Sequence, residues 1–167
     1  MGKQKTYNII TFGCQMNERD SETLAGYLEE RGYVHTEDHK TADLVLLNTC
    51  SVRDNADKRF FGTLGQLKHH KEQDADVVVG VCGCMMQQQS VVDAVMEKYP
   101  WVDMVFGTHN IHAFPKLLDK VLEGQEHGTF VDVWKDGGDI VEDLPYKRLY
   151  DHKAYVNIMF GCNNFCT

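Results

Sequence analysis

Short apolar runs rich in β-branched residues alternate along the chain with segments whose apolar positions recur every three or four residues. Runs of the first kind are typical of buried strands, and the second spacing is typical of amphipathic helices. Strands are predicted at Tyr7–Phe12, Leu44–Leu47, Val77–Val81 and Val102–Phe106, with a weaker extended piece at Tyr33–His35. Helices are predicted at Glu18–Arg31, Val52–Lys71, Met86–Lys98 and His112–Leu122.

Repeated strand–helix units place successive strands in parallel and return each helix across a face of the sheet. We therefore expect an α/β fold with an open, mostly parallel sheet and helices on both faces, of the flavodoxin or Rossmann type. In the first unit, Asn17 is the expected N-cap of the helix, and Gly32 is expected to end it.

The pattern changes after Val133. Residues 135–145 (KDGGDIVEDLP) are rich in glycine and acidic residues and show neither period, which indicates a linker. His152–Phe160 then looks like a new strand, and a cysteine-bearing loop follows it. We expect one domain over residues 1–134, a linker over 135–151, and over 152–167 the first strand of a second domain that is cut short.

The composition and the N-terminal residues bear on where in the cell the protein is expected. The chain has 167 residues, of which 43% are hydrophobic and 25% are charged, and both values are ordinary for a globular domain. No run approaches the roughly 20 apolar residues of a membrane span, and the N-terminus has no signal-peptide core. Met1-Gly2 with Thr6 formally matches a myristoylation pattern, but short patterns of this kind recur by chance. We expect a cytoplasmic monomer without a membrane partner.

The charge balance bears on nucleic-acid binding. Seventeen basic residues against 25 acidic residues give a net charge of −8. Proteins that grip a phosphate backbone usually present a basic stripe. If RNA is the substrate, most of the binding affinity must come from outside this segment.

Three of the six cysteines follow predicted strands: Cys14 follows the first strand, Cys50 the second and Cys84 the third. Without an export signal, such thiols are read first as metal ligands or redox groups. Loops at the carboxyl ends of parallel strands gather at one edge of the sheet, where ligands bind. A helix also begins after each cysteine, and its partial positive charge favours thiolate. The three thiols are therefore expected to meet in space.

Three converging thiolates suit a [4Fe–4S] cluster that leaves one iron free of protein ligands. Two other interpretations stay open: three buried core cysteines, or a structural zinc site, although structural zinc prefers four ligands. Cys84 is the preferred third ligand because it lies past the strand end, whereas Cys82 is either core or a spare thiol. Cys162 and Cys166 form a CxxxC pair, which in a loop after a strand can open a second cluster motif.

The chain resembles the N-terminal domain of the radical-SAM tRNA methylthiotransferases in three segments, FGCQMNERDSE, LLNTCSVRDNADKRFFGTLGQL and GVCGCMMQ. Its last residues, HKAYVNIMFGCNNFCT, are similar to the entry of the radical-SAM domain, whose motif is CxxxCxxC. The likeness covers nearly the whole chain. Gln15-Met16-Asn17 resembles the MiaB-type branch, which thiomethylates N6-isopentenyladenosine in tRNA. Related branches act on threonylcarbamoyladenosine or on a ribosomal protein.

This resemblance implies two [4Fe–4S] clusters in the full enzyme. Cys14, Cys50 and Cys84 would hold an auxiliary cluster that carries sulfur at its open iron. Cys162 and Cys166, with a third cysteine at the next motif position, would hold the cluster that cleaves S-adenosylmethionine. The resulting radical takes hydrogen from carbon 2 of an adenine next to the tRNA anticodon, and a second S-adenosylmethionine supplies the methyl group. Without the third cysteine, the barrel and the RNA-binding module, the chain is not expected to catalyse anything by itself.

Polar residues beside the cysteines have two interpretations each. Asn17, Asp20 and Ser21 would orient the cluster loop, or Asn17 serves only as a cap. Asn48 and Thr49 would donate hydrogen bonds to cluster sulfurs, or they are turn residues.

Arg53 offsets cluster charge or contacts substrate in one interpretation, and is a solvated arginine at a helix start in the other. Two other classes of protein also fit the pattern: a stand-alone iron–sulfur carrier of flavodoxin-like architecture, and an interaction module whose cysteines are core. The CxxxC pair after a fresh strand favours the enzyme.

Overall fold

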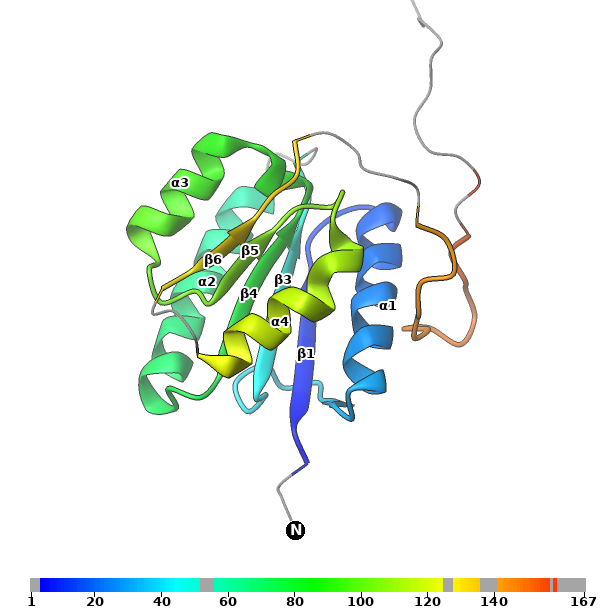
Figure 1. Cartoon of the computed structure of the whole chain (residues 1–167), viewed down its shortest axis with the longest axis horizontal. Helices are drawn as coiled ribbons and strands as arrows, with labels where there is room; N and C mark the ends of the chain where they lie inside the picture. The colour runs from blue at the N-terminus through cyan, green and yellow to red at the C-terminus, as the bar shows by residue number, and fades with distance from the viewer. Residues whose placement is uncertain (1–3, 52–55, 125–127, 136–140, 157, 159–167) are drawn as a thin grey trace, which may run out of the picture.

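A single parallel sheet organises the protein (Figure 1). The computed structural model describes residues 4–51, 56–124, 128–135, 141–156 and 158. Within these residues six strands form: β1 (Thr6–Thr11), β2 (Val34–His35), β3 (Leu44–Thr49), β4 (Val78–Gly83), β5 (Met104–Phe106) and β6 (Phe130–Asp132). Their order in the sheet is β2-β1-β3-β4-β5-β6, and every neighbouring pair is parallel.

Helices cover both faces of the sheet. The described residues form four α-helices and two short 3-10 helices: α1 (Gln15–Glu30), α2 (Ala56–Gln73), η1 (Cys84–Gln87), α3 (Gln89–Lys98), η2 (Ile111–Ala113) and α4 (Phe114–Glu123). α1 and α4 pack on one face, and α2 and α3 pack on the other (Figure 1). The predicted fold class, α/β with an open sheet between two layers of helices, is confirmed.

The central strands are buried on both sides. Along β3, Leu44 and Leu46 join the core under α1 and α4, whereas Val45 and Leu47 join the core under α2 and α3. All four side chains are fully buried. Burial on both faces explains why this strand reads as an unbroken apolar run rather than as an alternation of apolar and polar residues.

The strand order reverses its direction between β1 and β3. The chain moves outward from β1 to β2 and then returns past β1 to β3, so the direction of winding reverses between these two strands. In open α/β sheets, such a reversal separates the loops at the carboxyl ends of the two strands, and ligands bind there.

The start of α1 differs from the prediction. Asn17 is not the N-cap: Cys14 has the extended backbone of a cap residue, and Asn17 lies in the first turn, three positions later. The Asn17 side-chain oxygen accepts the backbone N–H of Cys14, which closes a capping box. The prediction failed because cysteine is an uncommon cap residue, whereas asparagine is a common one.

Three other segments differ from expectation. The predicted helix Met86–Lys98 is divided into η1 and α3, because Gln88 between them has extended backbone. β6 was not predicted, since it is only three residues long and half-exposed. The predicted strand His152–Phe160 is absent over its described residues 152–156, where polar groups bond to α1 instead of to another strand. None of the helices in the described ranges is long and apolar enough to cross a membrane.

Candidate metal centre

Three thiols follow three neighbouring strands at the same edge of the sheet. Cys50 comes directly after β3 and Cys84 directly after β4, while Cys14 lies three positions beyond the end of β1. Because β1, β3 and β4 are adjacent and parallel, all three cysteines lie at their carboxyl ends. Cys14 and Cys50 flank the reversal of strand order. The edge that sequence spacing predicts therefore includes the reversal of strand order, the place where ligands bind in open α/β sheets.

Two glycines let the cysteine loops approach one another. A Cβ atom on Gly13 would lie 2.4 Å from the Cβ of Cys50, and a Cβ on Gly83 would lie 2.2 Å from the carbonyl oxygen of Thr49. Both residues also have positive φ, +151° and +103° respectively, which favours glycine. Sequence reasoning missed this role, although the signal was present as a glycine directly before Cys14 and directly before Cys84.

A buried asparagine pair ties the first loop to the second. The Asn17 side-chain amide donates to the carbonyl oxygen of Thr49 at 2.8 Å and to the Asn48 side-chain oxygen at 3.1 Å. In return, the Asn48 amide donates to the backbone carbonyl of Asn17 at 2.8 Å and to the Ser21 hydroxyl at 3.0 Å. Asn17, Asn48 and Ser21 are fully buried. Since unpaired buried amides are costly, this reciprocal network fixes the separation of the Cys14 and Cys50 loops.

The third loop is joined to the second through Thr49. Its hydroxyl donates to the carbonyl oxygen of Cys82 at 2.7 Å, and the Thr49 side chain is fully buried. The interpretation of Asn48 and Thr49 as turn residues is wrong: both lie in β3, where the Asn48 side chain bonds to α1 and the Thr49 side chain bonds to β4. The Cys14 thiol has Asn17 Oδ1 as an acceptor at 3.3 Å.

Burial and neighbouring acidic groups raise the pKa of the Cys84 thiol. The pKa of Cys84 is raised by burial first, and then by the charges of Asp20, Cys50 and Cys14, while a backbone N–H opposes the shift. Ionised Cys50 and Cys14 thus oppose the ionisation of Cys84 in the metal-free protein. Bound metal cations would reverse this balance, because a coordinated thiol is deprotonated.

Cys82 occupies a different environment. It lies within β4, is fully buried, and packs with Leu46 and Phe106 in the core under α1 and α4. Burial raises its pKa well above the ordinary value, with added contributions from Asp20 and Cys84. Its position inside β4, in contrast to that of Cys84 past the strand end, favours Cys84 as the ligand.

Asp20 contributes a measurable pH dependence. Burial raises its pKa from 3.8 to about 7, and the charge of Arg19 opposes the shift. The folded state therefore binds this proton more tightly than the unfolded state, and stability is lost as the pH rises from about 4 to about 7. In the metal-free chain, Asp20→Asn is expected to be more stable than the parent at pH 8, with a gap that narrows towards pH 5. Urea unfolding across this range measures the gap, and a constant difference would contradict the assignment.

The candidate donors at this edge are the thiols of Cys14, Cys50 and Cys84. In the described ranges, no three His, Cys, Asp or Glu side chains converge closely enough to hold one metal ion. A cubane is wider than a single ion and takes thiolates spread over roughly 6–10 Å. Three soft sulfur donors are the ligands that iron–sulfur clusters take, and Asp20 is an acidic neighbour of Cys84. The residues present therefore fit such a group.

The remaining predicted site residues are distributed as follows. Asp20 and Ser21 lie on α1 beside the cysteine loops, and Ser21 belongs to the asparagine network. Cys162, Cys166 and Arg53 lie outside the described residues.

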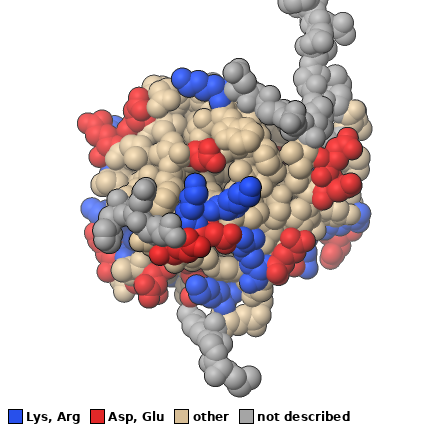
Figure 2. Space-filling model, viewed as in Figure 1, with Lys and Arg blue, Asp and Glu red and all other residues tan. Residues whose placement is uncertain are grey.

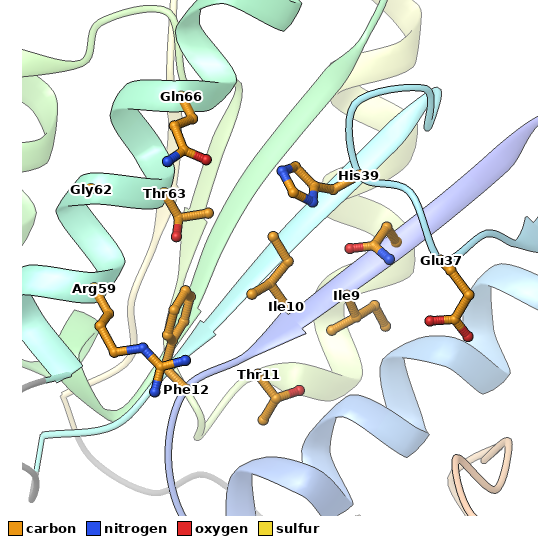
Figure 3. Close-up of a pocket in the computed structure, with 11 residues that line it drawn as sticks. Ile9, Ile10, Thr11, Phe12, Glu37, His39, Arg59, Gly62, Thr63 and Gln66 are labelled. Atoms are coloured by element: carbon orange, nitrogen blue, oxygen red, sulfur yellow. The ribbon is translucent and has the colours of Figure 1, made fainter.

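A groove beside this edge runs between β1 and α2, with a volume of 590 Å³. Figure 3 shows Arg59, Thr63 and Gln66 projecting from α2 towards Ile10 and Phe12 of the β1 segment. The groove reaches Phe12, two residues before Cys14, so the surface next to the cysteine edge is hollowed.

Fold and site together define a flavodoxin-like α/β domain with three thiols at the carboxyl edge of its sheet. Residues 6–107 match the model of the family described as "Uncharacterized protein family UPF0004". The chain belongs to this family, and it corresponds to the N-terminal domain of MiaB-type tRNA methylthiotransferases.

Two relatives illustrate the match. The chain is 52% identical over 166 residues to the tRNA-2-methylthio-N(6)-dimethylallyladenosine synthase of Alkaliphilus oremlandii (strain OhILAs), covering 99% of this chain and 35% of that protein. It is 48% identical over 167 residues to the synthase of the same name from Staphylococcus aureus (strain JH9), covering 100% of this chain and 32% of that protein. The chain spans about a third of the length of these curated relatives.

Proposed function

We propose that this chain is the auxiliary-cluster domain of an enzyme that adds a methylthio group to carbon 2 of N6-isopentenyladenosine beside the tRNA anticodon. The observation that carries the proposal is the convergence of the Cys14, Cys50 and Cys84 loops at one sheet edge. The names of the relatives specify the dimethylallyl derivative, another term for the isopentenyl one, which favours this substrate over threonylcarbamoyladenosine or a ribosomal protein.

In this proposal Cys14, Cys50 and Cys84 hold a [4Fe–4S] cluster. Cys162 and Cys166, with a further cysteine, hold a second one that binds S-adenosylmethionine. When bound, the two clusters supply sulfur for transfer and the reductive cleavage of S-adenosylmethionine to the radical that activates carbon 2. The domain boundaries proposed from the sequence, 1–134, 135–151 and 152–167, assign the first cluster to this domain and the second to the following one.

The protein's own contribution is placement. Cys14 is the N-cap residue of α1, so the partial positive charge of the helix start favours an anionic cluster bound there. The Asn17–Asn48 network holds two of the ligand loops at a fixed separation before metal arrives. Cys50 is fully buried, which limits the access of water and oxidants to that side of the site.

Two measurements test the proposal. Anaerobic reconstitution of the chain with iron and sulfide is expected to give one [4Fe–4S] cluster per chain, seen as a broad visible absorption shoulder. Next, this chain can replace the matching third of the Alkaliphilus relative in cells that lack the activity. Mass spectrometry of digested tRNA should then detect the 2-methylthio nucleoside, and a Cys50→Ala version provides the control. Failure of the chain to take up iron and sulfide would contradict the proposal.

Binding of tRNA by the isolated chain is expected to be weak, with a dissociation constant above about 1 μM at physiological salt. The net charge is −8, and Figure 2 shows acidic and basic side chains interspersed over one face. Affinity for RNA comes mainly from counterion release at phosphate contacts, which such a surface does not favour. Titration with the anticodon stem-loop measures it, and submicromolar binding would reveal a local basic patch that outweighs the net charge.

A further inference from the structure

The chain returns to α1 after β6 and docks along it. We call residues 144–155 the α1 strap; Figure 1 shows this segment in orange beside α1. The backbone N–H of Lys147 donates to the carbonyl oxygen of Glu22 at 2.8 Å, and the N–H of Leu149 donates to Glu22 Oε1 at 3.3 Å. Glu22 is only 1% exposed, so the strap's backbone supplies a donor to a buried carboxylate. A hydrogen bond to a buried carboxylate holds the strap in a defined position on α1.

Ion pairs fix the direction of the strap. Lys147 Nζ lies 3.1 Å from Glu29 Oε2 near the end of α1, and Lys153 Nζ lies 3.0 Å from Glu18 Oε2 near its start. The Tyr155 hydroxyl donates to the same Glu18 carboxylate. The strap therefore runs antiparallel to α1, over about 16 Å of helix, towards the end that carries the cysteines.

Gly26 makes this docking possible. Glycine weakens a helix interior, so its presence in the middle of α1 needs a reason. A Cβ at this position would lie 2.6 Å from the carbonyl carbon of Pro145 and 2.6 Å from the backbone nitrogen of Tyr146. The strap backbone occupies the space that a side chain at position 26 would need.

We propose that the α1 strap is a positioning element that fixes where the chain leaves this domain relative to the three-cysteine edge. Tyr155 is held at Glu18, one helical turn after Cys14. Cys162 follows Tyr155 by seven positions, a reach of at most about 24 Å. The inference rests on the proposed function, because it takes Cys162 as a ligand of the second cluster. The separation of the two clusters is then set by docking on α1 and not by linker length alone.

The first test measures docking in the chain itself, without any cluster. Gly26→Ala is expected to release the strap and to speed trypsin cleavage after Lys147 and Arg148 by about tenfold or more, because cleavage follows the population of the open form. The matched control is Gly62→Ala, a helical glycine in α2 whose added Cβ meets nothing within 4 Å. Mass spectrometry of the early fragments gives both rates. Equal rates in the two variants would overturn the docking.

A second variant tests the docking even if Gly26→Ala does not fold. Glu22→Ala adds no bulk and removes the acceptor of the Leu149 N–H. It is expected to accelerate the same cleavages. Its helix content, measured by circular dichroism, is expected to equal that of the parent. Slow cleavage in this variant, as in the parent, would also count against the docking.

The third measurement tests positioning in the complete enzyme with both clusters reduced. The magnetic interaction between the clusters broadens their EPR spectra in a way that depends on their separation. Gly26→Ala is expected to keep the parent iron and sulfide content but to change this broadening, whereas Gly62→Ala should not. An unchanged spectrum would overturn the positioning role. If the parent lacks the auxiliary cluster, the proposed function fails and the positioning role falls with it, while the trypsin result still decides whether the strap docks.

Discussion

Replacement of Cys84 by alanine is expected to abolish iron–sulfur uptake by the chain, whereas replacement of Cys82 is expected to leave it nearly intact. Two thiolates cannot hold a cubane, and Cys84 lies past the end of β4 beside the other cysteine loops. Cys82 instead packs in the core, with its pKa well above the ordinary value. The measurement is iron and sulfide content after anaerobic reconstitution, with the visible absorption shoulder recorded in parallel.

The two cysteines provide a matched pair, since they are two residues apart and receive the same substitution. Cys82→Ala is expected to cost stability through the lost core contacts, so its unfolding curve must be measured before loading. A folded Cys82→Ala variant that takes up no cluster, together with a Cys84→Ala variant that does, would show that the ligand assignment is wrong.

Gly83→Ala is expected to destabilise the chain by at least about 1–3 kcal/mol, the usual cost of a residue held in an unfavourable backbone region. The added Cβ would also lie 2.2 Å from the carbonyl oxygen of Thr49. This clash can be relieved only if the backbone moves. Movement of Thr49 shifts Cys50, the next residue, so cluster yield is expected to fall along with stability. Urea unfolding measures the first effect and iron content the second.

The control for this prediction is Gly62→Ala, which meets open space in a helix. It is expected to raise stability by up to about 1 kcal/mol, because alanine favours helix over glycine. If Gly83→Ala behaved like this control in both measurements, the close approach of the β3 and β4 loops would not matter for the site.

The sequence predicted the layout of the sheet well because its signals are local. β3 and β4 are buried on both faces, so each appears as an unbroken apolar run. The placement of Cys14, Cys50 and Cys84 at one edge followed from parallel topology alone. What failed were boundaries, such as the start of α1, where a cysteine takes the place usually held by Asn, Ser or Asp.

The interactions that hold the site together could not be predicted, since they join residues far apart in the chain. The amide of Asn17 in α1 bonds to that of Asn48 in β3, and in the sequence each looks like an ordinary cap or turn residue. Gly26 likewise gave no local signal of the strap, because Pro145 and Tyr146 are more than a hundred residues away. Only tertiary structure brings such partners together.

The most direct test of the central claim is anomalous diffraction at the iron edge from crystals of the anaerobically reconstituted chain. We expect one cluster of four irons, three of them bonded to the sulfurs of Cys14, Cys50 and Cys84, with no protein side chain on the fourth. A single metal ion at this edge, or iron bonded to Cys82 in place of Cys84, would contradict it.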